Sequence, residues 1–123
     1  MWQGDAIQLD FRPGNPPRRS TFDQVIEFGL ALTPEGSQLW SWMPQERVVS
    51  EAQIQVIRDG DHTRYEAAIP WEALPGIVHA AGSVAAFSFT VNESDGGGFR
   101  GWLELTPGIC GGKDASHFAL LRF

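Results

Sequence analysis

Carboxylates are the most numerous side chains in this sequence that could perform catalysis. The candidates for an acid–base pair are Asp5, Asp10, Glu27, Glu93, Asp95 and Glu104. A glycosidase needs two such groups facing each other across a cleft, about 5–10 Å apart. Spacing along the chain cannot show such a pair, and solvated surface charge accounts for most of these carboxylates. The sequence therefore predicts a protein that is not an enzyme.

Histidine and cysteine, the usual ligands of transition metals, are sparse. His62, His79 and His117 form no HxH or HExxH pattern, so a histidine metal site is not predicted. Cys110 is the only cysteine, which excludes an internal disulfide and a thiolate zinc cage.

Oxygen ligands gather in the segment "NESDGGG" at residues 92–98. Amide and carboxylate oxygens on a glycine-rich loop suit calcium, so Asn92, Glu93 and Asp95 are its candidate ligands. The segment lacks the ligand at position 12 of an EF-hand loop, and a polar turn without metal is the alternative. No cofactor is required, and structural calcium is the one candidate.

Size and charge limit the classes of partner. The 123 residues predict one domain, residues 1–123, with a single core. Nine basic and fifteen acidic residues give a net charge of −6, without a basic cluster, which argues against nucleic acid. No apolar run approaches the roughly 18 residues of a membrane span. The chain also shows no signal-peptide pattern.

Apolar and polar residues alternate with a period of two along most of the chain. Eight short segments show this pattern between Gly, Pro, Asn and Asp clusters, at residues 5–11, 24–32, 37–43, 52–59, 63–69, 83–92, 99–105 and 117–123. This is typical of an all-β, antiparallel, jelly-roll-like sandwich. One short helix or turn is expected near residues 70–75, between Pro70 and Pro75.

The same alternation assigns residues to the two faces of the strands. The apolar face contains Ile7, Leu9, Phe11, Ile26, Phe28, Leu30, Leu32, Phe87, Phe89 and Val91. The opposite face contains Gln8, Asp10, Glu27, Ser88, Thr90, Asn92, Arg100, Trp102 and Glu104, while Trp40 and Trp42 share one parity. Indoles beside amide, carboxylate and guanidinium groups suit a sugar ring. Ordinary exposed strand positions are the alternative.

Three stretches, in order, resemble the family 9 carbohydrate-binding modules. They are "WQGDAIQLDF", "GDHTRYEAAIPWEAL" and "FSFTVNESDGGGFRGWLELTPGICGGKDASHFALLRF". The family consists of β-sandwiches that are non-catalytic and attached to secreted polysaccharide-degrading enzymes, and it is related to haem- and sugar-binding sandwich domains. This relation leaves haem as an open alternative, with Met43 and either His117 or Lys113 as axial ligands. The resemblance implies binding of a cellulose- or xylan-type poly- or oligosaccharide, beside a covalently linked glycoside hydrolase. It also implies an extracellular or periplasmic location.

Site residues follow from this resemblance position by position. Trp2 occupies the position of one of the family's two clamping tryptophans, and Arg100 occupies the position of an arginine. Gln8 stands where the family has a Glu that hydrogen-bonds to sugar hydroxyls, and Thr90 stands where it has a Gln. Gly111 and Gly112 stand where the second clamping tryptophan is expected. The second aromatic surface would therefore come from Trp102, Trp40 or Trp42.

Strands that normally precede the first clamping tryptophan are not found in this chain. A sandwich without them exposes unpaired edges, which predicts self-association or contact with another domain. The alternative function is a structural or docking sandwich in a secreted protein.

Overall fold

The computed structural model describes residues 5–94 and 96–123 and is all-β. In these residues the chain forms antiparallel strands and two short 3-10 helices, with no α-helix. The predicted all-β, antiparallel class is confirmed. No helix in the described ranges is long and apolar enough to span a bilayer.

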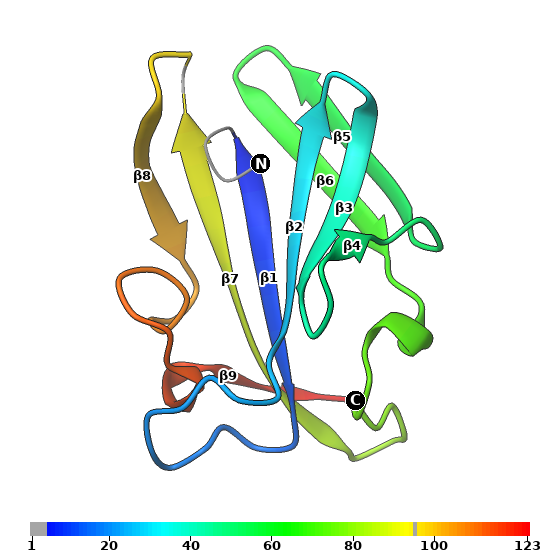
Figure 1. Cartoon of the computed structure of the whole chain (residues 1–123), viewed down its shortest axis with the longest axis vertical. Coiled ribbons are helices and arrows are strands. Elements are labelled where there is room, and N and C mark those ends of the chain that lie inside the picture. Colours follow the sequence, from blue (N-terminus) through cyan, green and yellow to red (C-terminus); the bar gives the residue numbers. More distant parts are fainter. Residues whose placement is uncertain (1–4, 95) are drawn as a thin grey trace.

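The strands form a large sheet and a hairpin (Figure 1). In the order β4-β3-β2-β1-β7-β8, the large sheet consists of Arg47–Val48, Gly36–Met43, Ile26–Thr33, Ala6–Pro13, Val84–Ser94 and Phe99–Glu104. Strand β9 (Ala119–Arg122) pairs with the first half of β7, and β8 pairs with its second half. The hairpin consists of β5 (Gln53–Asp59) and β6 (His62–Ala68). The first strand, β1, therefore lies inside the sheet.

Local sequence signals account for most of these boundaries. All eight predicted segments contain a strand, and only β4, two residues long, was not predicted. The predicted short helix is η1 (Trp71–Ala73), which follows the extended Pro70. Gly60 has a φ of 61°, a left-handed conformation that glycine adopts without strain, and it turns β5 into β6.

The larger core lies between the main sheet and the hairpin. Its buried members are Ile26, Phe28, Leu30, Leu39, Val49, Val56, Ala73, Leu74, Ile77 and Ala85. Ile26, Phe28 and Leu30 of the apolar face predicted from alternation are in this core. Ile7, Phe87, Phe89 and Val91, which were also expected inside, are only half-buried and lie outside it. Leu32 is an exception: it was expected inside and is 52% exposed, because it lies near the end of β2 and borders an open cavity.

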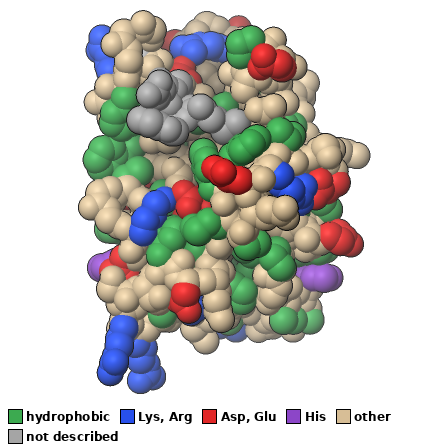
Figure 2. Space-filling model, in the orientation of Figure 1, with side chains coloured by type: hydrophobic (Ala, Val, Ile, Leu, Met, Phe, Trp, Pro, Cys, Tyr) green, Lys and Arg blue, Asp and Glu red, His purple; other side chains and the backbone are tan. Residues whose placement is uncertain are grey.

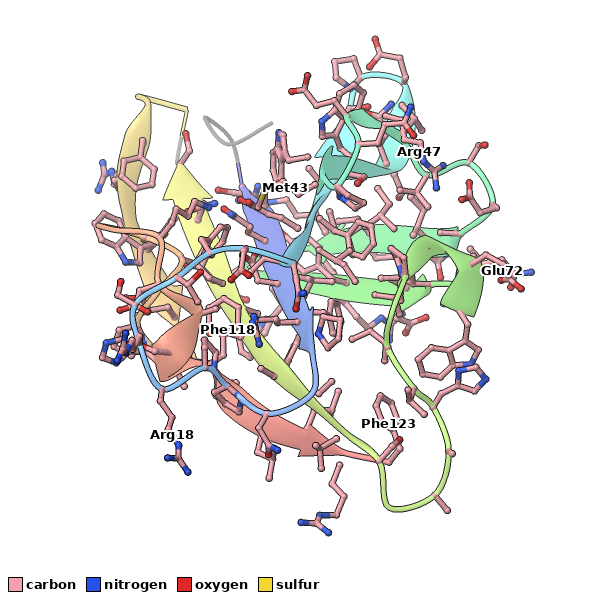
Figure 3. All side chains as sticks on the ribbon, turned by 60° about the horizontal axis from the view of Figure 1, so that its bottom comes forward. Arg18, Met43, Arg47, Glu72, Phe118 and Phe123 are labelled. Carbon is pink, nitrogen blue, oxygen red and sulfur yellow. The ribbon has the colours of Figure 1, made fainter. Side chains whose placement is uncertain are left out.

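A second, smaller core lies on the other face of the main sheet. It contains Val25, Ala86, Ile109, Ala115 and Phe118, with Phe22, Met43 and Cys110 packed against it. Residues 105–118, here called the covering segment, supply much of it and include η2 (Ala115–His117). Figure 3 shows Phe118 inside the curve of the loop that connects β1 to β2. The predicted polar face is therefore partly covered.

Candidate functional site

The strand register places five of the predicted sugar-binding residues on one face of the main sheet. Residues paired across antiparallel strands share a face. Trp40 is paired with Gly29, Gly29 with Gln8, and Gln8 with Thr90. In the next row, Asn92 is paired with Trp102 on β8. Gln8, Thr90, Asn92 and Trp102 thus share a face, as alternation predicted, and the register adds Trp40 to them.

The five residues on this face differ in how deeply they are buried. Thr90 is fully buried and its hydroxyl donates to the carbonyl of Leu103 at 3.0 Å. Gln8 is 9% exposed and its amide donates to Glu27, and Asn92 is 7% exposed. The covering segment contacts this face, because the Cys110 thiol lies 3.6 Å from the Thr90 hydroxyl. Gln8 and Thr90 are therefore occupied by internal contacts.

A buried acidic pair lies at the centre of the polar face. Asp10 and Glu27 are paired across β1 and β2, and Asp10 is fully buried. Lys113 of the covering segment donates to Glu27 at 2.6 Å, and its ammonium lies 4.9 Å from the centre of the Phe22 ring. This contact joins residues 86 positions apart and ties the covering segment to the sheet.

The Asp10 carboxyl has an unusual ionisation. Burial, and then the charge of Glu27, raise its pKa to about 8, and Lys113 opposes this only in part. Neither Asp10 oxygen accepts a hydrogen bond from the residues that the structure describes, although nearby Gln8 slightly favours the ionised form. At neutral pH the Asp10 carboxyl is therefore mostly protonated, beside the Lys113–Glu27 ion pair.

An open cleft of about 480 Å³ lies between the end of the main sheet and the hairpin. Its lining includes Asn92 from β7 together with Arg100 and Trp102 from β8, three of the predicted sugar-binding residues. Val91 and Leu103 point into it from the apolar face. The side chains of Asn92 and Trp102 point to the opposite face, so these two residues border the cleft and do not fill it. Arg100 is exposed, and Trp102 is 44% exposed.

An ion pair that sequence reasoning missed crosses this cleft. Arg58 of β5 donates to Asp5 at 2.6 Å, and the second Asp5 oxygen accepts from the backbone N–H of Ser94 at 2.8 Å. Tyr65 of β6 lines the same space. Asp5 and Arg58 are 53 residues apart, so only the packing of the hairpin on the sheet brings them together.

The remaining predicted aromatic residues are dispersed. Trp40 and Trp42 are partly buried on β3, away from the cleft. Trp2 lies outside the described residues, as does Asp95. Gly111 and Gly112 are exposed and belong to the covering segment.

The candidate metal and haem ligands that the structure describes do not converge. Asn92 is buried on the polar face, whereas its neighbour Glu93 is exposed and points to the opposite face. In the described ranges, no group of three or more His, Cys, Asp and Glu side chains could hold a metal ion. Met43 packs against the smaller core, while Lys113 is bonded to Glu27 and His117 lies 3.3 Å from Asp114.

No protein-family model, curated protein or solved structure matches this chain. The family 9 resemblance therefore depends on the ordered motifs alone.

Proposed function

We propose that this chain is a non-catalytic carbohydrate-binding domain that holds a β-glucan- or xylan-type saccharide in the cleft between β7–β8 and the hairpin. The observation that carries the proposal is that Arg100 and the Asp5–Arg58 pair line one cleft of about 480 Å³, with Asn92 and Trp102 at its border. This volume is within the usual range of about 300–1,000 Å³ for small-ligand sites.

The chemistry of the cleft suits a sugar. At the border of the cleft, the Trp102 ring stacks on Phe99 with 5.9 Å between centroids and an interplanar angle of 18°, which supports the orientation of the indole. An indole face packs against the C–H groups of a pyranose. Guanidinium, carboxylate and hydroxyl groups from Arg100, Asp5 and Tyr65 match sugar hydroxyls as hydrogen-bond partners.

The expected affinity is modest. One stacked ring contributes about 0.5–1.5 kcal/mol beyond its buried area, and each neutral hydrogen bond about 1 kcal/mol. After the cost of association, a Kd of roughly 10 µM to 1 mM follows. Such a domain serves to keep a covalently linked glycoside hydrolase near its polysaccharide, outside the cell or in the periplasm.

Calorimetry with a glycan panel tests the proposal. The panel contains glucose, cellobiose, cello- and xylo-oligosaccharides and xyloglucan, each titrated with and without calcium. Saturable heat with at least one oligosaccharide supports carbohydrate binding. The absence of heat with every glycan at millimolar concentration contradicts it. The proposal requires no cofactor, and a melting temperature that falls with a chelator would identify structural calcium.

A structural or docking sandwich is the second candidate function. One observation favours it: apolar side chains of β7 and β8 remain accessible, with Leu103 77% exposed. Figure 2 shows basic side chains scattered over the visible face without a continuous patch, which gives no support to nucleic acid as the partner.

A further inference from the structure

The second layer of the sandwich is narrower than the first. The hairpin makes its main contacts with β3 and β2. Figure 1 shows it over that side of the main sheet, with β7 and β8 on the other side. A two-stranded layer cannot cover a sheet that continues through β1 and β7 to β8.

Apolar residues occupy the part of the sheet beyond the hairpin. We call them the uncovered stripe: Ile7, Phe87, Phe89, Val91, Leu103 and Leu105. The register places Ile7 beside Val91 and Val91 beside Leu103, and the Leu105 N–H donates to the Phe89 carbonyl. Leu103 is 77% and Leu105 49% exposed, and the others are half-buried. This alternation is typical of strands whose apolar face is packed against a second sheet.

The free side of β6 borders the stripe. In the described sheets β6 pairs only with β5, so its other edge is unpaired. A cavity of about 600 Å³ lies where β6 meets the main sheet, lined by Ile7 together with Ile57, Thr63 and Tyr65. The surface is thus a step, with the uncovered stripe as its floor and β6 as its wall.

We propose that a second copy of this chain fills the step, related to the first by a two-fold axis parallel to the strands. Rotation about this axis lays the partner's β7 and β8 on the stripe, about 10 Å away, as in packed sheets. The two hairpins then lie at opposite ends, and each β8 edge lies beside the other copy's β6. The contact is isologous, so the pair closes as a dimer.

Pairing between the two β6 edges is excluded by the same geometry. An axis perpendicular to the sheets would place both main sheets on the same side of the joined hairpins. The partner's β2 and β3 would then occupy the space of β1, β7 and β8. Only the face-to-face arrangement buries the uncovered stripe.

The size of the stripe predicts a reversible dimer. Three strands spaced about 4.8 Å apart, and about 20 Å long, offer a floor of roughly 14 by 20 Å. With the β6 wall, we expect roughly 1,000 Å² of total buried area, the lower limit for a specific interface.

Each copy carries a net charge of −6, so added salt should strengthen the association.

Sedimentation velocity of the full chain, from about 1 µM to 1 mM, tests the dimer. We expect the weight-average mass to rise from the 13.5 kDa of one chain toward twice that value. Leu103→Lys and Leu105→Lys should each lower the association constant at least tenfold. A mass that stays monomeric at every concentration overturns the proposal.

Leu120→Lys is the matched control. Leu120 is 49% exposed, but it is paired with Ala86 and therefore lies on the other face of the sheet. The Leu120→Lys variant should dimerise with the same association constant as the parent chain. An equal loss in this variant, or no loss in the Leu103 and Leu105 variants, overturns the assigned face.

The dimer does not depend on the proposed sugar site. Val91 and Leu103 belong to both surfaces, so a bound saccharide and a second copy should compete. Leu105 is not among the residues that line the cleft. The Leu105→Lys variant therefore tests the dimer even if no saccharide binds.

Discussion

Trp40 and Trp102 lie on the same face of the main sheet, but three strands separate them. Trp40 is on β3 and Trp102 on β8, with β2, β1 and β7 between. Four strand spacings of about 4.8 Å place their backbones roughly 19 Å apart. Two indoles at that distance cannot enclose one sugar ring. Among the tryptophans that the structure describes, Trp102 alone borders the cleft and is the stacking surface of the proposed site.

Trp102→Ala should weaken saccharide binding at least tenfold. The variant removes the stacking surface, worth about 0.5–1.5 kcal/mol, and part of the apolar contact area. Trp71→Ala is the control, because Trp71 is similarly exposed at 41% but stacks on His79, far along the chain from the cleft residues. Calorimetry should show an unchanged Kd for the control. Equal losses in both variants would contradict the site.

Thr90→Val should leave saccharide affinity unchanged and lower the free energy of unfolding by about 1 kcal/mol. The Thr90 hydroxyl is buried and donates to the Leu103 carbonyl, so the variant removes one buried hydrogen bond. Urea denaturation and calorimetry on the same preparation separate the two effects. Lost binding with unchanged stability would instead place Thr90 at the sugar, as the family resemblance implies.

Stability should fall as pH rises from about 4 to 8 because of Asp10. Its pKa is about 8 in the folded chain and near 3.8 when unfolded, so the folded state holds a proton that the unfolded state has released. The favourable contribution of Asp10 to the free energy of unfolding is complete below the pKa of the unfolded state. It falls by up to about 1.4 kcal/mol per pH unit and is lost once the pH passes the pKa of the folded state.

Asp10→Asn should remove this pH dependence. The amide resembles the neutral acid, so the variant should match the parent chain near pH 4 and exceed it by a few kcal/mol near pH 8. Urea denaturation across this range measures the difference. Glu35→Gln, at an exposed loop carboxylate, serves as the control. Parallel curves for Asp10→Asn and the parent chain would contradict the assigned ionisation.

Gly108→Ala should destabilise the covering segment. Gly108 has a φ of 115°, and an added Cβ would collide with the backbone carbonyl of Asp114. The positive φ alone costs about 1–3 kcal/mol, and the collision adds to it. Gly112→Ala is the control, because no atom lies within 4 Å of its added Cβ. Thermal melts should show a lower Tm for the first variant only. An unchanged Tm there would contradict the close approach.

The sequence predicted the strands because alternation and turn chemistry are local signals. Segments such as residues 83–92, with apolar residues at every second position, formed strands close to their predicted bounds. Strand β4 escaped prediction because two residues carry no period. Leu32 was misplaced because alternation assigns a face and does not say where the opposing layer ends.

The candidate site was only partly predictable, since its accessibility depends on distant contacts. Alternation placed Gln8 and Thr90 on a common face, but their burial depends on the covering segment. That segment is held by contacts such as Lys113 with Glu27, which no local pattern indicates. The Asp5–Arg58 pair escaped prediction for the same reason.

The most direct test of the central claim is an amide and indole NMR titration with the best-binding oligosaccharide. Saccharide binding in the cleft predicts saturable shifts at the Trp102 indole N–H and at Asn92, Arg100 and Arg58, with the Trp40 and Trp71 signals unmoved. Shifts confined to Trp40, Trp71 or the covering segment would contradict the cleft. No shift with any glycan of the panel would contradict carbohydrate binding itself.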